Sequence, residues 1–180
     1  MNFCSQCGQP VTVQVPAGDN RPRHVCGSCG HVHYQNPLIV VGCVPEYRGE
    51  ILLCRRAIEP RRGFWTVPAG FMEIGETLAE GAIRETWEEA EAQVELGALF
   101  AIVDVVQARQ VHVFFRGRLL EPAFAAGEES LEVRLFAPAA IPWEEIAFPS
   151  VRIALERCLA DRGSGNETLH LTSVPAIRLG

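Results

Sequence analysis

The sequence has no apolar run long enough to cross a membrane and no amino-terminal leader of the secretory kind. Among its 180 residues no stretch reaches about 18 consecutive apolar residues, the length that a membrane span requires. The chain opens with Met1-Asn2-Phe3-Cys4, whereas an exported protein would carry a basic region followed by an apolar one. We therefore expect a soluble, cytoplasmic protein that does not associate with a membrane.

Positive charge is also scarce. The chain has 16 Lys and Arg against 22 Asp and Glu, a net charge of −6, and no basic run is interleaved with aromatic residues. Proteins that bind long nucleic acids usually carry such a run or a basic face, so a long nucleic acid is not the expected partner. Any phosphate must be bound by local positive charge or by metal ions. With 48% hydrophobic residues, the chain can bury one sizeable core and add one small module.

The seven cysteines fall into two groups. Three stand alone in apolar or helical stretches and are expected to be buried: Cys43, Cys54 and Cys158. The other four form the pattern C-x2-C-x18-C-x2-C: Cys4, Cys7, Cys26 and Cys29. In a chain without an export signal, paired cysteines of this spacing are more often a metal site than disulfides.

Four thiolates close a tetrahedral shell around Zn2+ and leave no position for a substrate. Gly8 and Gly30 follow the two pairs and ease the tight turns. Between the pairs, residues 11–15 alternate like a strand and residues 16–20 read as a turn. The sequence thus predicts a zinc ribbon at residues 1–36 that is folded by a structural zinc ion, with iron in the same ligands as the chemical alternative.

From Leu38 the pattern changes to buried strands, expected at residues 38–44 and 51–54 and again at 64–67. Thr77 and Glu80 fit a capping box that begins a helix over residues 78–90. One side of this helix is predicted to face the core: Leu78, Ala79, Ala82, Ile83, Thr86 and Ala90.

Three carboxylates, Glu85, Glu88 and Glu89, lie on an adjoining sector of the same helix. Like charges this close repel one another, and hard divalent cations such as Mg2+ or Mn2+ would relieve the repulsion. The spacing alone leaves open a plain solvated acidic face. The residues before the helix add further information.

Gly70, Glu76, Arg84-Glu85 and Glu88-Glu89 stand at the spacing G-x5-E-x7-R-E-x2-E-E, which resembles the signature box of the Nudix hydrolase family. Two positions depart from that box. Glu91 stands where the box has its final glycine, and Ala92 is a small version of the last apolar position. Because that glycine normally ends the helix, the departure puts the helix end in doubt more than the activity.

The resemblance implies an α/β fold, the α/β/α Nudix sandwich with a mixed sheet, over residues 37–160. It also implies a reaction in which metal-activated water attacks a phosphorus of a nucleoside diphosphate derivative. Glu85 and Glu89 would then be metal ligands, with Glu88 a ligand directly or through water and the carbonyl of Ala69 completing the shell. Two further residues, Arg84 and Glu76, would orient these carboxylates.

Many Nudix enzymes add a carboxylate from a later loop, and residues 127–132 are the candidate source. Glu129 is favoured over Glu132, whose alternation with its apolar neighbours suggests a strand face, and Glu128 remains possible. An ordinary charged turn is the alternative.

A four-cysteine ribbon ahead of a Nudix domain resembles a subgroup that includes NADH pyrophosphatases and a related set acting on FAD and ADP-ribose. The NADH motif is absent at residues 104–110, and so is the proline that ADP-ribose enzymes carry near Gln107. Residues 3–8, 25–37 and 129–136 resemble the second set, so hydrolysis of FAD or ADP-ribose with release of AMP is expected. Related ribbon-bearing enzymes suggest a homodimer. NADH or another dinucleotide is the alternative substrate. An inactive zinc-ribbon adaptor that binds RNA or protein is the alternative class, and the intact carboxylates argue against it.

Two segments stay less defined. Four arginines precede the box, and we hypothesise that one or two of them bind the diphosphate, with Arg55 and Arg56 as the first candidates: Arg55, Arg56, Arg61 and Arg62. Since neighbours on a strand point to opposite faces, only one of Arg55 and Arg56 should do so, and solvated charges are the alternative. Residues 161–180 lie outside the resemblance and are expected to form a tail or an added strand.

Overall fold

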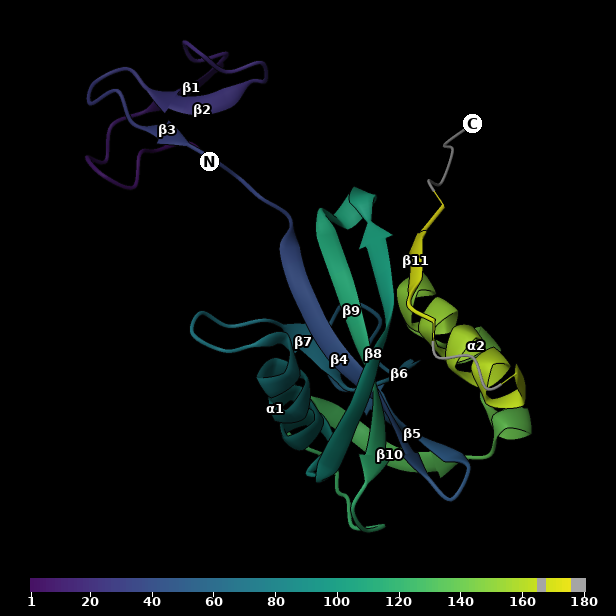
Figure 1. Ribbon diagram of the computed structural model, residues 1–180. Coiled ribbons are helices and arrows are strands. Elements are labelled where there is room, and N and C mark those ends of the chain that lie inside the picture. The colour runs from purple at the N-terminus through teal and green to yellow at the C-terminus, as the bar shows by residue number, and fades with distance from the viewer. Residues whose placement is uncertain (165–167, 176–180) are drawn as a thin grey trace. The chain divides into compact units, whose positions relative to one another are not determined.

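The structure is a computed structural model that describes residues 1–164 and 168–175 (Figure 1). It divides into two compact units, Met1–Asn36 and Pro37–Gly180. Of the predicted tail, residues 165–167 and 176–180 lie outside the described part. No helix within that part is long and apolar enough to cross a membrane.

The first unit is a three-stranded antiparallel sheet of strands β1 (Val11–Gln14), β2 (Arg23–Cys26) and β3 (Val32–His33), in that order. In the turn between β1 and β2, Asp19 accepts hydrogen bonds from the backbone of Asn20 and from Arg23. This unit buries few apolar side chains, so the four cysteines must supply much of its stability.

The second unit is built on a mixed sheet in the strand order β10-β5-β4-β9-β8-β11. Its long strands are β4 (Leu38–Tyr47), β5 (Glu50–Arg56), β8 (Val94–Val105), β9 (Gln110–Leu119), β10 (Ser130–Phe136) and β11 (His170–Ser173). The pairs β4-β9 and β8-β11 are parallel, and the other neighbours are antiparallel. Two short strands extend it, β6 (Trp65–Thr66) beside β5 and β7 (Ala69–Phe71) beside β4.

Two helices cover opposite faces of this sheet, α1 (Leu78–Ala90) and α2 (Pro149–Ser164), as Figure 1 shows. Alternation along β5 explains the two layers: Leu52 packs in the cluster that contains Ala90 of α1, whereas Leu53 packs with Leu155 of α2. The expected α/β/α sandwich with a mixed sheet is confirmed. Three short 3-10 turns complete the unit: η1 (Val106–Ala108), η2 (Pro138–Ala140) and η3 (Trp143–Glu145).

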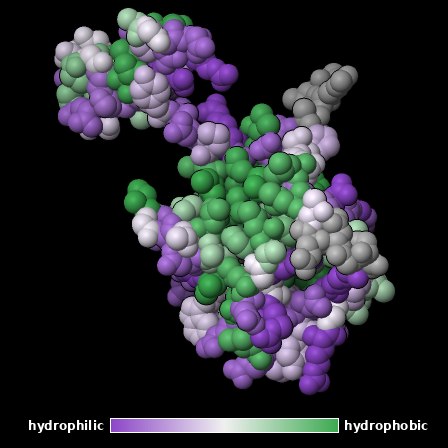
Figure 2. Space-filling view, viewed as in Figure 1, coloured by the Kyte–Doolittle hydropathy of each residue, from purple (hydrophilic) through white to green (hydrophobic). Residues whose placement is uncertain are grey.

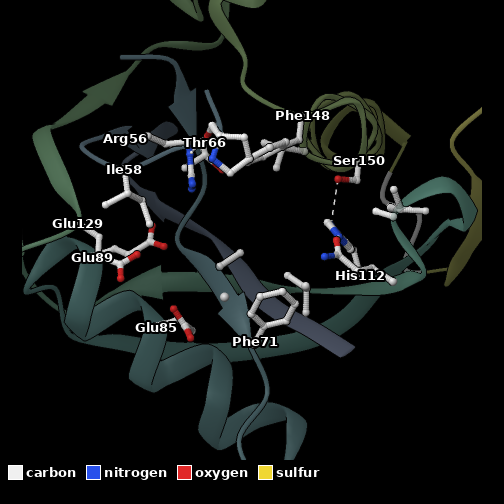
Figure 3. A pocket seen from close by; sticks show the side chains of 18 of the residues that line it. Arg56, Ile58, Thr66, Phe71, Glu85, Glu89, His112, Glu129, Phe148 and Ser150 are labelled. Carbon is white, nitrogen blue, oxygen red and sulfur yellow. Dashed lines mark hydrogen bonds between the residues drawn. The ribbon is translucent and has the colours of Figure 1, made fainter. Parts of the chain in front are cut away.

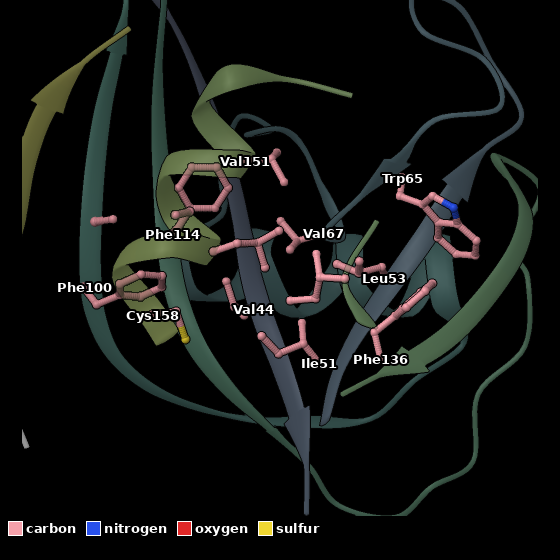
Figure 4. Close-up of a cluster of buried hydrophobic side chains, with 14 of the residues drawn as sticks. Val44, Ile51, Leu53, Trp65, Val67, Phe100, Phe114, Phe136, Val151 and Cys158 are labelled. Carbon is pink, nitrogen blue, oxygen red and sulfur yellow. The ribbon is translucent and has the colours of Figure 1, made fainter. Parts of the chain in front are cut away.

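The larger core lies between the sheet and α2 (Figure 4). Phe100 and Phe114 are completely or almost completely buried there, and the rings of Trp65 and Phe136 meet edge to face at 4.8 Å. Trp143 packs against the same cluster. This core fixes the strand ends from which the pocket described below is built.

Helix α1 begins as predicted, since the capping box of Thr77 and Glu80 is complete. The predicted buried face is wrong at Ile83, which is 43% exposed, while Glu85 and Glu89 are 8% and 6% exposed. The helix is turned so that these carboxylates, rather than Ile83, lie against the sheet. At its end Glu91 adopts the left-handed conformation, with φ of 46°, that the glycine of the box would adopt.

Strands β8 and β9 were not predicted from the sequence, although they form the centre of the sheet with β4. The stretch corresponding to β8 shows register irregularities between Leu96 and Ala101, which break its alternation. Within the predicted tail, β11 adds to the sheet beside β8 and α2 continues to Ser164.

Candidate active site

Helix α1 and the loop before β10 bring carboxylates together in one pocket of about 910 Å3. Glu85, Glu88 and Glu89 come from the helix, and Glu128 and Glu129 come from the loop. Figure 3 shows Glu89 and Glu129 side by side, with Glu85 on the same side of the pocket. Residues about 40 positions apart in the sequence thus meet at one wall, as expected for the favoured Glu129.

Two glycines permit this close packing. A side chain at Gly70 would begin 2.4 Å from the carboxylate of Glu85, and one at Gly127 would begin 1.7 Å from the backbone oxygen of Glu88. The backbone of Gly127 donates to the carbonyl of Glu89 at 3.2 Å, which holds the loop against the helix. The glycine that opens the sequence motif is therefore required because a carboxylate occupies the space of its missing side chain.

The carboxylates carry more negative charge than the chain compensates. Burial raises the pKa of Glu89 to about 8, and the negative charge of Glu85 contributes to that rise. Burial also raises the pKa of Glu85, although a hydrogen bond from Arg84 opposes the shift. Clustered, partly buried carboxylate oxygens fit a hard divalent cation such as Mg2+ or Mn2+, which would supply the missing positive charge.

Arg84 links the remaining residues of the motif. Its guanidinium binds Glu76 through two nitrogens and also donates to Glu85 at 2.7 Å and to Glu88 at 2.9 Å. A further N–H reaches the carbonyl of Phe71 at 3.1 Å. Arg84 and a backbone hydrogen bond from Glu73 lower the pKa of Glu76 to about 2. These bonds hold the carboxylates in place, and the role of Arg84 and Glu76 in orienting metal ligands stays a prediction.

Ala69 lies in the wall of the pocket, on β7. Its backbone hydrogen bond to Glu89 helps to keep that carboxylate charged. A side chain at Gly81 of α1 would begin 2.7 Å from the side chains of Glu76 and Val41, so this glycine makes room for those two residues. The carbonyl of Ala69 as a metal ligand remains a prediction.

The arginines at the end of β5 diverge. Arg56 lines the pocket, donates to the carbonyl of Pro60 at 2.9 Å and lies 5.0 Å above the ring of Phe148. Arg55 instead donates to the carbonyl of Gly63 at 2.9 Å and faces Glu132 at 3.8 Å. The structure thus brings one of the pair to the carboxylates.

Three other candidates lie elsewhere. The second-choice carboxylate, Glu132, is outside the pocket and pairs with Arg55 and Arg134. Arg61 and Arg62 are not part of the pocket wall. Glu132 lies on β10, in line with the strand face that its alternation suggested. Arg61 and Arg62 lie in the loop after β5, where no regular period shows which way a side chain points.

The side of the pocket away from the carboxylates is formed by residues that the sequence did not single out. Gln110 and His112 come from β9, Ser150 comes from the first turn of α2, and Phe148 lies just before that helix. Ser150 and His112 are 38 positions apart, so no local spacing could have linked them. Their meeting depends on how α2 packs on the sheet.

The four paired cysteines lie together in the first unit. Their sulfur atoms are all within 4.8 Å of one another, with Cys4 and Cys29 at 3.7 Å and Cys7 and Cys26 at 3.5 Å. A tetrahedral zinc with sulfur ligands at about 2.3 Å would space them by about 3.8 Å, so the cluster fits this ion.

Hydrogen bonds from the amides of Gly8 and Gly30 to the carbonyls of Cys4 and Cys26, at 2.9 and 3.0 Å, close the two turns of the cluster. Backbone amides of Cys29 and Ser28 lower the pKa of Cys26 to about 6, which favours the thiolate that binds metal.

The three lone cysteines are buried as expected: Cys43, Cys54 and Cys158. Burial raises the pKa of each thiol. A raised pKa disfavours the thiolate, so these side chains act as core hydrophobes.

Comparison with known proteins agrees with this arrangement. Residues 36–155 match the family described as the NUDIX domain, and residues 2–35 match the family described as Nudix N-terminal, a zinc ribbon. A crystal structure of a Nudix hydrolase from Nitrosomonas europaea is 49% identical to this chain, covers 97% of it and 99% of that chain, and superposes with a TM-score of 0.93.

Curated relatives match about half of this chain. The NAD-capped RNA hydrolase NudC of Chromobacterium violaceum is 40% identical over 95 residues, or 52% of this chain and 33% of its own length. The protein of the same name from Edwardsiella ictaluri is 37% identical over 95 residues, or 52% and 34%. The match thus spans about a third of the length of these relatives. The fold is shared with an ADP-ribose pyrophosphatase from Streptococcus suis. That structure is 22% identical, covers 77% of this chain and 100% of that chain, and superposes with a TM-score of 0.60.

The conclusion rests on the carboxylate helix, the four-cysteine ribbon and the family matches together. The chain belongs to the Nudix hydrolase family and to its zinc-ribbon-bearing subgroup.

Proposed function

We propose that this protein hydrolyses the diphosphate bond of a nucleoside diphosphate joined to another group, with FAD or ADP-ribose as favoured substrates and AMP as a product. The observation that carries the proposal is the placement of Glu85 and Glu89, less than a tenth exposed, in one pocket wall with Glu129. A chain that buries like charges this way loses stability unless a cation compensates them.

Mg2+ or Mn2+ bound here would shield the diphosphate and lower the pKa of a water molecule. Glu85 and Glu89 would hold the ion, and Glu88, which is half exposed, would do so directly or through water. Arg84 keeps the carboxylates of Glu85 and Glu88 in place by donating to both. The carbonyl of Ala69 would add an oxygen ligand.

Two further side chains would take part in the reaction. Glu129 lines the same wall from the loop before β10, so its carboxylate can accept the proton that the attacking water loses. Arg56 also lines the pocket, and the guanidinium nitrogens other than Nε, which donates to Pro60, would bind phosphate oxygens. A diphosphate between them would have its scissile phosphorus beside the carboxylates.

The substrate class follows from the rest of the pocket. Phe71, Val105 and Phe148 give it an apolar side that suits a flat ring, and a volume of about 910 Å3 accommodates a compound of dinucleotide size. FAD and ADP-ribose both carry a ring and a diphosphate. Because the curated relatives are named NAD-capped RNA hydrolases, NADH or another dinucleotide is the second candidate.

The other assignments are proposals as well. One zinc ion held by the four cysteines would fold residues 1–36, and the protein would act in the cytoplasm. Figure 2 shows apolar side chains gathered over one face of the second unit. Among the exposed apolar side chains of this unit are Leu38, Val106 and Leu171, at 56%, 71% and 71% exposure. A second copy of the chain covering that face would make the expected homodimer, which light scattering of the purified protein would detect.

A substrate panel tests the proposal. Zinc-loaded protein is incubated with FAD, ADP-ribose, NADH, a diadenosine polyphosphate and capped RNA, each with Mg2+ or Mn2+, and the products are identified. We expect AMP and the second phosphate-bearing half from FAD or ADP-ribose at the highest rate. Cleavage of none of the panel, together with metal-independent binding of RNA or protein, would favour the adaptor alternative.

A further inference from the structure

Gln110, His112 and Ser150 form a chain of hydrogen bonds at the side of the pocket that lies away from the carboxylates. His112 is 2.9 Å from the side-chain oxygen of Gln110 through Nε2 and 3.0 Å from the hydroxyl of Ser150 through Nδ1. All three residues line the pocket, and Figure 3 shows His112 and Ser150 facing it from β9 and α2. The mechanism proposed above does not use them.

The chemistry of the three groups fixes the direction of each bond. An amide oxygen can only accept a hydrogen bond, so Nε2 of His112 carries the proton that it donates to Gln110. The other ring nitrogen, Nδ1, then has only a lone pair and accepts the hydroxyl proton of Ser150. With its oxygen held in this way, Gln110 keeps its NH2 group as a donor of fixed orientation.

Burial keeps this arrangement in one state. His112 is 8% exposed and Ser150 is 1% exposed, so water cannot easily replace either partner. Burial also lowers the pKa of His112 to about 4, so the imidazole stays neutral at pH 7 with one donor and one acceptor. Gln110 is only partly buried, and its amide can be reached by a ligand.

The space in front of Gln110 is flanked by aromatic side chains. Figure 3 shows Phe71 and Phe148 between the carboxylates and His112, one on each side of the open space. The guanidinium of Arg56 lies over one face of the Phe148 ring, 5.0 Å from its centre. A planar ring between them would present its edge toward β9.

We infer that the amide of Gln110, oriented by His112 and Ser150, determines specificity by donating a hydrogen bond to an acceptor on the edge of the substrate's heteroaromatic ring. The inference rests on the proposed function, because the ring is the part of the nucleotide substrate that lies beyond its diphosphate. Gln110 touches the substrate, whereas His112 and Ser150 are positioning residues. This subsite recognises the half of the substrate that carries a heteroaromatic ring. It does not recognise a sugar phosphate that lacks such a ring.

Binding to the zinc-loaded protein without added Mg2+ or Mn2+ tests the inference by itself. Calorimetry measures Kd for AMP and FMN, which carry a heteroaromatic ring, and for ribose 5-phosphate, which carries a sugar phosphate and no heteroaromatic ring. The variants are Gln110→Ala and the isosteric Gln110→Glu, which replaces the NH2 donor with an acceptor. Gln107→Ala is the matched control, since Gln107 lies outside the pocket and donates to Pro175.

We expect Kd for AMP or FMN to rise about tenfold in Gln110→Ala, the loss of one neutral hydrogen bond, and at least as much in Gln110→Glu. Ribose 5-phosphate should bind equally to parent and variants, and Gln107→Ala should match the parent. Ser150→Ala should raise KM for the best nucleotide substrate with little change in kcat, because only the orientation of Gln110 is loosened. Thermal melting identifies any variant that fails to fold. If Ser150→Ala fails to fold, the Kd values of the two Gln110 variants decide the test.

Three results would overturn the inference: unchanged Kd for both AMP and FMN in the two Gln110 variants, an equal loss for ribose 5-phosphate, or no binding of either ring compound by the parent. These outcomes are distinct from failure of the proposed function. A protein that shows the ring-specific loss but cleaves no diphosphate would retain this subsite and refute the hydrolysis.

Discussion

The guanidinium of Arg84 holds both carboxylate oxygens of Glu76, with donor–acceptor distances of 2.9 and 2.8 Å. The two residues are eight positions apart, one before α1 and one within it. Since the same guanidinium donates to Glu85 and Glu88, the pair fixes the position of two carboxylates of the pocket. A paired arginine of this kind orients metal ligands and is not itself a ligand.

Replacing Glu76 with glutamine should therefore weaken catalysis without abolishing it. Glu76→Gln removes the charge that anchors Arg84, and loss of such an orienting partner typically costs about 10- to 100-fold. We expect kcat to fall by that amount with a smaller change in KM. Glu80→Gln is the control, because the amide oxygen can still cap the backbone of Thr77. A Glu76→Gln enzyme with the parent kcat would refute the orienting role.

Arg56 and Arg55 give a paired test of diphosphate binding. Only Arg56 lines the pocket, while Arg55 binds Gly63 and faces Glu132. Arg56→Ala should raise KM about tenfold or more with little effect on kcat, since a charge-assisted hydrogen bond common to substrate and transition state is lost. Arg55→Ala should leave KM within about twofold. If the two substitutions changed KM equally, or if neither changed it, Arg56 would be excluded as the residue that binds the diphosphate.

How far the sequence predicts this site depends on how local each feature is. The capping box of Thr77 and the carboxylates of Glu85 and Glu89 follow helical spacing, so residue order revealed them. Ile83 was misplaced because an apolar side chain normally takes the buried face, whereas here Glu85 and Glu89 occupy it. Such conflicts between local pattern and structure are expected at functional sites.

The far side of the pocket depends instead on long-range packing. His112 lies on β9, a strand that the sequence reading did not identify, and Ser150 begins α2. Neither belongs to a local motif. Strand alternation predicted that Arg55 and Arg56 would diverge, but which of them faces the pocket depends on the twist and pairing of β5 with β10.

The ribbon should contain one metal ion per chain. If the four cysteines bind zinc, metal analysis of protein washed free of loose ions should find about one zinc per chain. Cys26→Ser should release that zinc and unfold residues 1–36, which circular dichroism and proteolysis would detect, while some hydrolysis persists if the second unit folds by itself. Ser28→Ala is the control in the same turn. Protein with intact thiols and neither zinc nor iron would contradict this assignment.

Glu91 is a site where the family's glycine should stabilise the protein. Glu91 adopts φ of 46° at the end of α1, and this left-handed conformation costs a non-glycine residue about 1 kcal/mol or more. Glu91→Gly should therefore raise the free energy of unfolding by about 0.5 to 1 kcal/mol, after allowance for glycine's greater freedom in the unfolded chain. Glu91→Ala keeps the strain and should not. Denaturant unfolding of both variants measures the difference, and a destabilised Glu91→Gly would contradict the explanation.

Metal-dependent hydrolysis at the carboxylates of α1 is the central claim, and comparison of the parent with Glu89→Gln tests it most directly. Initial rates of AMP release from FAD and ADP-ribose are measured at saturating Mg2+ or Mn2+, with thermal melting to confirm folding. Because the substitution keeps size and removes one buried charge from the proposed ion site, turnover should fall by about 100- to 1000-fold while the fold is retained. Turnover by Glu89→Gln close to that of the parent at saturating metal would contradict the account.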